Sequence, residues 1–350
     1  MKALHMAFLF LLVGTSFVLL ERRGETGMLL VMAAMVGLLG FFSLAWRWMG
    51  RKQMALATEI RDRTITWWWM IAIFMLALST HRMVSFAFLG FLCFASLREY
   101  YSMLPMEETL DARLLSFRDR ASIFASYLAI PVIIFVAYIQ WYELFIILVP
   151  VYVFLLTPIV FVLQNRTTGS LKSLGIVALG FMFFVHNLGH CLFMINMGAI
   201  VLMYCFALTE ARDLLSFWIG KGLAARARTM PEGFLRRALE LRVAPDISPK
   251  KTWAAGLLAA VLVAALSLVF TPLMPSFPDG EMSYAYCAFV GLMIGVLGLF
   301  GDLVFSMIKR DIGVKDSGAS LPGHGGVIDR VDSLVFTIPI VFHLIRWKYF

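Results

Sequence analysis

The residues of this chain that are best suited to chemistry lie close together near its C-terminal end. Asp302, Ser306 and Lys309 are four and seven residues apart, so a helix would carry all three on one face. Asp329 and Asp332, three residues apart, would share a face in the same way. Carboxylates on two helix ends, joined by a glycine-rich turn, can converge on a hard cation such as Mg²⁺.

Basic residues and glycines between these acids suit a different ligand. Lys309, Arg310, Lys315 and Arg330 offer cationic donors to phosphate oxygens. Residues 322–326 read Pro-Gly-His-Gly-Gly, a turn with so little side-chain bulk that its backbone N–H groups can approach a phosphate. Each residue alone would also fit a solvated loop. The ordered set indicates nucleotidyl transfer, in which positioning and charge neutralisation supply most of the catalysis.

The composition predicts that membrane helices hold these residues. Of the 350 residues, 61% are hydrophobic and 15% charged, whereas soluble domains have about 25% charged residues. A membrane-spanning helix needs about 20 mostly apolar residues, so we expect an all-α polytopic membrane protein with about 9–11 transmembrane helices. The candidate spans are residues 4–20, 27–46, 66–80, 83–97, 121–141, 142–163, 173–193, 197–211, 253–274, 284–308 and 333–349.

The basic residues predict the orientation of these spans. With a cytoplasmic N-terminus, 25 of the 30 Lys and Arg residues fall on the cytoplasmic side. Both long polar segments, 209–252 and 309–332, then face the cytoplasm as catalytic loops. The net charge of +8 is accounted for by this topology and by contact with anionic lipid heads, and no basic and aromatic pattern indicates nucleic-acid binding. We divide the chain into a multi-span region, residues 1–200, and a catalytic membrane region, residues 201–350.

Two segments outside the acidic region each have two interpretations. Residues 232–243 alternate apolar and basic side chains, which suits a helix on the anionic inner leaflet or a connecting helix packed on the domain. His186 and His190 share a helix face at metal-ligand spacing, but a pair without a third ligand is more often a polar contact between membrane helices.

The ordered residues between Ser306 and Asp332 resemble the signature of the phosphatidate cytidylyltransferase family. The matching positions are Ser306, Lys309, Arg310, Lys315, Asp316, Gly318, Pro322, Gly323, His324, Gly325, Gly326, Asp329, Arg330 and Asp332. A second family motif is similar to residues 247–253, Ile-Ser-Pro-Lys-Lys-Thr-Trp, and a weaker one begins at Asp213 and ends at Lys221. The resemblance covers roughly residues 200–350, and Leu97 to Tyr101 is also familiar.

The resemblance implies an enzyme that uses a divalent metal to join CTP and phosphatidic acid, giving CDP-diacylglycerol and pyrophosphate. Carried over by position, Asp302 and Asp329 would hold Mg²⁺, and Lys309 and Asp332 would complete the catalytic set. The implied substrate-binding residues are Ser306, Arg310, Lys315, Asp316, His324, Gly325, Gly326, Arg330, Asp213, Lys221, Ser248, Lys251 and Thr252. The family also allows a monovalent cation such as K⁺ and a homodimer. These implications place the site in the bacterial inner membrane, facing the cytoplasm.

The sequence departs from the family pattern at four positions. The family commonly has acids where this chain has Phe305, Ala254 and Ala255, and it has Asn or Ser where this chain has Arg212. Losing acids near a cation site could alter metal affinity or substrate choice. Two alternatives therefore stand beside the main interpretation: a related CTP-dependent enzyme acting on another lipid phosphate, and a non-enzymatic lipid carrier.

Overall fold

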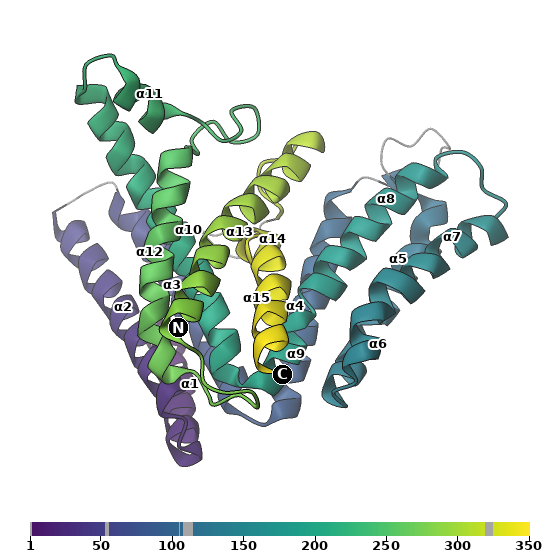
Figure 1. Ribbon diagram of the computed structural model, residues 1–350, viewed down its shortest axis with the longest axis horizontal. Helices are drawn as coiled ribbons and strands as arrows, with labels where there is room; N and C mark the ends of the chain where they lie inside the picture. The colour runs from purple at the N-terminus through teal and green to yellow at the C-terminus, as the bar shows by residue number, and fades with distance from the viewer. Residues whose placement is uncertain (1, 53–55, 105, 108–114, 319–324) are drawn as a thin grey trace.

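The computed structural model describes residues 2–52, 56–104, 106–107, 115–318 and 325–350. Its helices are α1 (Lys2–Arg23), α2 (Thr26–Arg51), α3 (Leu56–Ser79), α4 (Arg82–Met103), α5 (Arg120–Tyr138), α6 (Tyr142–Ile147), α7 (Phe154–Leu163), α8 (Ser170–Phe181), α9 (His190–Met197), α10 (Ala199–Thr229), α11 (Phe234–Glu240), α12 (Trp253–Phe270), α13 (Tyr284–Asp311), α14 (Ile328–Val331) and α15 (Leu334–Tyr349). Shorter elements are the 3₁₀ turns η1 (Phe117–Asp119) and η4 (Thr271–Leu273), the π-helical turns η2 (Leu148–Val153) and η3 (Met182–Asn187), and the strands β1 (Met106–Glu107) and β2 (Leu115–Ser116). Figure 1 shows their arrangement.

The expected all-α membrane class is confirmed. Within the described residues, eight helical segments are long and apolar enough to cross a membrane, and they coincide with eight of the predicted spans. The other three predicted ranges, 66–80, 197–211 and 333–349, are also helical, in α3, α10 and α15. Helix α15 has only 16 residues, and α3 and α10 carry several charged side chains. In keeping with the all-α prediction, the two strands of the described chain are two residues long each and pair in parallel.

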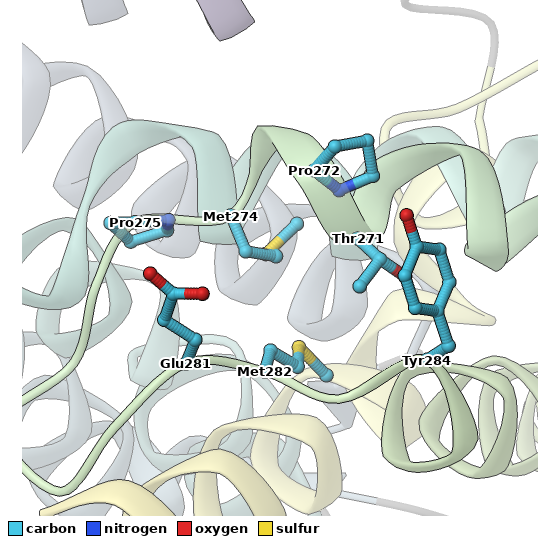
Figure 2. A pocket seen from close by; sticks show the side chains of 7 residues that line it. All are labelled: Thr271, Pro272, Met274, Pro275, Glu281, Met282 and Tyr284. Atoms are coloured by element: carbon cyan, nitrogen blue, oxygen red, sulfur yellow. The ribbon is translucent and has the colours of Figure 1, made fainter.

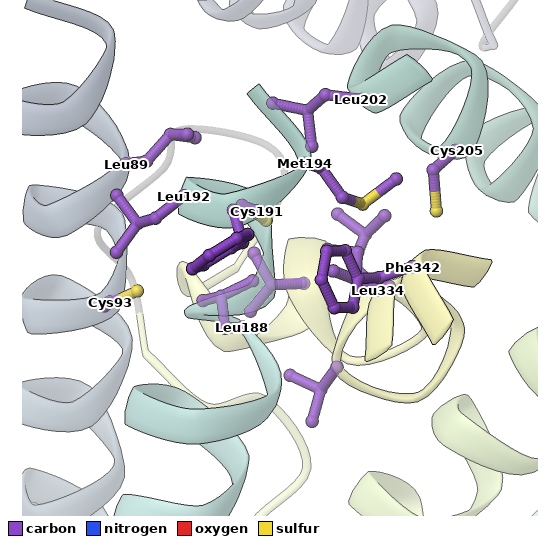
Figure 3. Packing of buried hydrophobic residues seen from close by; sticks show 14 of the residues in the cluster. Leu89, Cys93, Leu188, Cys191, Leu192, Met194, Leu202, Cys205, Leu334 and Phe342 are labelled. Carbon is purple, nitrogen blue, oxygen red and sulfur yellow. The ribbon is translucent and has the colours of Figure 1, made fainter. Parts of the chain in front are cut away.

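The core joins helices from both predicted regions of the chain. Helix α4 contacts α3, α5, α8, α9 and α14, while α9 contacts α10 and α15. In Figure 3, side chains from α4, α9, α10 and α15 meet around Cys191, and Cys191, Leu192, Cys205 and Phe342 are at most 1% exposed. All four cysteines are buried and unpaired, as expected of small apolar side chains. Residues 1–200 and 201–350 thus share one core.

Small residues bring α12 and α13 into close contact. A β-carbon added at Gly295 would overlap the backbone of Ala260, and one at Gly291 would lie 2.6 Å from Ser267. Small residues at helix interfaces are typical of membrane proteins, because they let the backbones approach and gain dispersion contacts. This contact matters for function, since α13 carries Asp302 and Lys309 at its far end.

The two long polar segments meet at one end of the molecule. Helix α10 extends past the predicted span 197–211 to Thr229, and α11 lies beyond it at the upper end of Figure 1. The chain then returns toward the membrane helices, where Arg242 and Thr252 pair their backbones as an isolated antiparallel bridge. Thr252 is followed directly by α12, so the segment 209–252 ends where a spanning helix begins.

The contact between α12 and α13 predicts a stability effect. Replacing Gly295 by Ala should force the helices apart and lower the free energy of unfolding by about 1–3 kcal/mol. Gly40→Ala is the matched control, because an added β-carbon there meets nothing within 4 Å and alanine favours the helix. Thermal unfolding in detergent measures both variants, and an equal melting temperature for Gly295→Ala and the wild type would contradict this packing.

Candidate active site

Helix α13 presents Asp302, Ser306 and Lys309 together, as their spacing predicted. Ser283 caps the start of this helix, because its hydroxyl accepts a hydrogen bond from the Tyr286 backbone N–H at 3.3 Å. Near its other end, Ser306 Oγ donates to Asp302 Oδ1 at 3.4 Å, one turn away. Lys309 Nζ donates to Asp329 Oδ1 at 2.6 Å. One helix face therefore reaches both predicted metal ligands.

An ion pair joins the polar segment 209–252 to helix α13. Lys251 Nζ pairs with Asp302 Oδ2, and the two side chains are 22% and 28% exposed. Thr252 has a structural role beside it, because its hydroxyl accepts a hydrogen bond from Ala255 N–H at 3.4 Å and caps α12. Lys250 is exposed. The segment 209–252, predicted as a catalytic loop, therefore meets α13 at Asp302.

Asp329 is held by hydrogen-bond donors from three segments. Besides Lys309, the backbone N–H groups of Ser317 and Gly326 donate to its Oδ2 at 3.0 and 3.1 Å. Burial opposes ionisation, but these donors together keep the pKa of Asp329 below its usual value. Gly325 has φ +80°, and a β-carbon there would lie 2.6 Å from Asp329 Oδ2. The glycine is required both for this backbone conformation and for the close approach.

A glutamate that the sequence analysis did not assign to the site closes the same region. Glu99, near the end of α4, is 7% exposed. It accepts hydrogen bonds from Ser317 Oγ, Val327 N and Ile328 N. It was missed because it is distant in the chain, although a glutamate at the end of an apolar run is itself a signal of function.

Two further carboxylates, Asp213 and Asp332, form a second group with Asp302. Asp213 on α10 pairs with its neighbour Arg212, and Ser333 Oγ donates to Asp213 Oδ2 at 3.2 Å. Asp332 is 9% exposed, and its Oδ1 accepts from Ser333 N at 2.7 Å. Burial, together with the negative charges of Asp302 and Asp213, raises the pKa of Asp332 to about 8. Asp213, Asp302 and Asp332 are therefore close enough for their charges to interact.

The positions that depart from the family pattern have separate structural roles. Phe305 is 1% exposed and packs on Phe183 and Phe184, with ring centres 5.3 and 5.7 Å apart. Ala255 is buried where α12 passes Gly220. Arg212 is 1% exposed, and its Nε and Nη2 atoms have no hydrogen-bond partner within the described part of the chain. Phe305 and Ala255 thus belong to packing faces, whereas Arg212 adds a buried positive charge beside Asp213.

The remaining predicted site residues lie around this centre without a direct contact to it in the described structure. Lys221 Nζ lies 4.1 Å from the Phe217 ring centre and 5.5 Å from that of Trp218, about 12 Å along α10 from Asp213. Arg330 is half-buried, and its Nε has no partner among the described residues. Arg310, Lys315 and Asp316 are exposed, and Ser248 is half-buried. His324, with Pro322 and Gly323, lies outside the described residues.

The donor set fits a metal that also binds substrate. Among the residues with described placement, no three His, Cys, Asp or Glu side chains are arranged as ligands of one ion. Mg²⁺ usually takes only one or two carboxylates and fills its coordination with phosphate oxygens and water. Asp302 is 28% exposed and offers such a carboxylate, whereas Asp329 is 10% exposed and both its oxygens accept hydrogen bonds. Asp302 and Asp329 as a metal pair stay a prediction.

Two other polar features lie away from this centre. The rings of His186 and His190 meet edge to face with their centres 4.8 Å apart, and the ring centre of His190 lies 5.1 Å from that of His343. A cavity of about 310 Å³, shown in Figure 2, is lined by residues that include Thr271, Glu281 and Tyr284. Tyr284 starts α13, so this cavity lies about 27 Å along the helix from Asp302. It is not part of the candidate active site.

Comparisons with known proteins agree with the resemblance noted in the sequence. A model of the Cytidylyltransferase family matches residues 61–348. The uncharacterized protein YnbB of Escherichia coli is 30% identical over 311 residues, which is 87% of this chain and 92% of that protein. The phosphatidate cytidylyltransferases of Synechocystis sp. and Bacillus subtilis are 39% and 32% identical over 153 and 148 residues, each 42% of this chain. Those matches span 44% and 48% of the two enzymes, less than half of each.

The raised pKa of Asp332 predicts how stability depends on pH. The folded protein binds this proton more tightly than the unfolded chain does, so the resulting stabilisation is present at low pH and is lost as pH rises toward about 8. Between about pH 5 and about pH 9, the melting temperature of the wild type should fall more than that of Asp332→Asn, which cannot ionise. Parallel melting-temperature profiles for the two proteins would show that Asp332 ionises near its usual pKa.

Proposed function

Because the chain belongs to the cytidylyltransferase family, we propose that it joins CTP and phosphatidic acid to form CDP-diacylglycerol and pyrophosphate. Relatives named phosphatidate cytidylyltransferase support this reaction over 42% of the chain. The observation that carries the proposal is the convergence of Asp213, Asp302 and Asp332 with Lys251 and Lys309 at one end of the membrane helices. A site at that level meets a lipid phosphate in the membrane surface and a nucleotide in water.

The basic residues around the carboxylates are suited to holding the reacting phosphates. In the proposed step, an oxygen of phosphatidate attacks the α-phosphorus of CTP, and the bond to the β-phosphate oxygen breaks in line, releasing pyrophosphate. The attacking oxygen is already anionic, so the step needs no strong general base. Lys251, Lys309 and Arg330 would neutralise the phosphate charges, because preorganised cations stabilise the transition state without reorganising. The backbone N–H groups of Ser317 and Gly326 lie beside Lys309, since all three donate hydrogen bonds to Asp329.

A divalent metal completes the proposal. We assign Mg²⁺ to Asp302 and Asp329, with phosphate oxygens as its other ligands, and a monovalent cation such as K⁺ is compatible with the nearby Asp213 and Asp332. When bound, Mg²⁺ would neutralise phosphate charge and orient the leaving group. Lys251 and Lys309 pair with these two acids, so both cations lie beside the residues that would hold the metal and its phosphate ligands.

The proposed location follows from the distribution of charge. We place the protein in the bacterial inner membrane as a multi-pass protein whose site faces the cytoplasm, because 25 of its 30 basic residues lie on that side of the predicted topology. CTP is a cytoplasmic nucleotide, so this orientation supplies the substrate.

We propose phosphatidic acid as the lipid phosphate that accepts the cytidylyl group, and the comparisons leave a second candidate. The match to YnbB covers almost the whole chain, whereas the matches to named phosphatidate enzymes cover less than half of those proteins. A related lipid phosphate is therefore the second candidate acceptor. Competition between phosphatidic acid and other lipid phosphates for CTP, with the lipid product identified by mass spectrometry, distinguishes the two.

The reaction is tested directly with the purified protein. In lipid–detergent micelles containing Mg²⁺ and phosphatidic acid, the wild type should release pyrophosphate from CTP and form CDP-diacylglycerol. Lys251→Ala should lower turnover by about 10²–10³-fold, because it removes a preorganised cation next to Asp302. Lys250→Ala is the matched control, since this neighbouring lysine is exposed, and it should retain turnover.

The outcome separates the enzyme from a carrier. No CTP turnover by wild-type protein with a normal melting temperature would overturn the proposed function. A larger loss for Lys250→Ala than for Lys251→Ala would show that the ion pair with Asp302 is not part of the site.

The metal assignment predicts a shift in Mg²⁺ dependence. Asp302→Asn and Asp329→Asn should each lower turnover strongly and raise the Mg²⁺ concentration for half-maximal activity by roughly tenfold or more. Asp246→Asn, an exposed acid in the same polar segment as Lys251, serves as the control. An unchanged Mg²⁺ requirement in Asp329→Asn, with a lower melting temperature, would make Asp329 a residue that only holds the backbone.

A further inference from the structure

Glu99 connects the first half of the chain to the glycine-rich segment of the candidate site. Its Oε1 accepts from Ser317 Oγ at 2.6 Å and from Ile328 N at 2.9 Å, and its Oε2 accepts from Val327 N at 2.9 Å. These donors lie more than 200 residues away along the chain. They also come from both sides of residues 319–324 in the sequence, so a single carboxylate binds a side-chain hydroxyl before them and two backbone N–H groups after them.

The glycines around Glu99 are shaped to its carboxylate. A β-carbon on Gly326 would overlap both Glu99 Oε1 and Ser317 Oγ, and one on Gly318 would lie 3.2 Å from Glu99 Oε2. Gly313 differs from these two glycines, because no atom lies within 4 Å of a β-carbon added there. Two of the signature glycines are thus explained by close contact with this one side chain.

Helix α4 holds Glu99 rigidly. The next two residues, Tyr100 and Tyr101, donate hydrogen bonds from their hydroxyls to the Ile176 and Val177 carbonyls of α8 at 3.0 and 3.4 Å. The end of α4 is therefore fixed against α8 on one side and against α14 on the other. A carboxylate on a fixed helix is a better anchor for a backbone segment than one on a mobile loop.

Ser317 and Gly326 link Glu99 to the acid at the centre of the site. The backbone N–H of Ser317 donates to Asp329 while its hydroxyl donates to Glu99. Gly326 donates its N–H to Asp329 and packs against Glu99. Any shift of these two residues away from Glu99 would therefore also displace the donors that orient Asp329 toward Lys309.

We propose that Glu99 is a positioning residue for the cytidylyl transfer, which sets the backbone around Asp329 from a helix outside the catalytic region. This inference rests on the proposed function. In this role Glu99 acts through Ser317, Gly326 and Asp329. The multi-span first half of the chain then contributes a positioning residue to the active site.

The test compares three variants in the full-length protein. Glu99→Gln is nearly isosteric but replaces one acceptor oxygen by an NH₂ group, which cannot accept from the Ser317, Val327 or Ile328 donors. Ser317→Ala removes one of the same hydrogen bonds and is the milder second variant. Glu21→Gln, an exposed glutamate on α1, is the control. Hydrogen exchange of the Val327 and Ile328 amides and the kinetic constants for CTP and phosphatidic acid are measured for each.

Glu99→Gln should lower kcat by roughly 10–100-fold with little change in KM for phosphatidic acid, as removal of supporting hydrogen bonds typically does. Exchange of the Val327 and Ile328 amides should speed up about tenfold or more, because their acceptor is weakened. The double variant Glu99→Gln/Ser317→Ala should lose less than the product of the two single losses, since both remove the same contact.

Two results would overturn the proposal. Wild-type kinetics in Glu99→Gln would do so, and so would faster amide exchange without any loss of kcat, which would make Glu99 structural only. If the wild type itself does not turn over CTP, the proposed function fails. Amide exchange then still decides separately whether Glu99 holds this backbone, and unchanged exchange would also refute the anchor.

Discussion

A carboxylate at the end of a membrane helix must be paired with a cation or with hydrogen-bond donors, because the hydrocarbon offers neither. The cytoplasmic end predicted for this protein is organised by meeting that requirement three times. Asp302 pairs with Lys251, Asp329 with Lys309 and two backbone N–H groups, and Glu99 with the Ser317 hydroxyl and two further N–H groups. The pairings of Asp302 and Glu99 join different helices and loops, and that of Asp329 joins α13 to α14, so satisfying the charges also assembles the site.

This requirement also explains which residues are small. Gly325 and Gly326 lie where the backbone comes closest to Asp329 and Glu99, and a side chain there would displace an acceptor from its donors. Gly291 and Gly295 act further along α13, where they let α12 approach and so fix the helix that carries Asp302. The carboxylates require the backbone to approach them closely, and the glycines make this approach sterically possible.

Local patterns were enough to predict the helical class and the common face of Asp302, Ser306 and Lys309, and both are confirmed. The family resemblance, read from ordered residues, is confirmed by the match over residues 61–348. Spacing could not reveal Glu99, because its partners are 218 to 229 residues away and no local period connects them. It also could not show that Phe305 faces Phe183, since this contact depends on how the helices are packed. The catalytic roles of the individual site residues stay predictions.

The packing around Phe305 and Arg212 bears on two of the positions where the sequence departs from the family pattern. Phe305 lies on a face of α13 that packs against the rings of Phe183 and Phe184. An ionised acid in its place would need a cation, which these two rings cannot supply. Replacing an acid there removes a negative charge from α13, while Arg212 adds a positive one next to Asp213. Arg212 lowers the negative charge of the group formed by Asp213, Asp302 and Asp332, whereas Phe305 lies among aromatic rings. A change in metal affinity or acceptor choice from these departures stays a prediction.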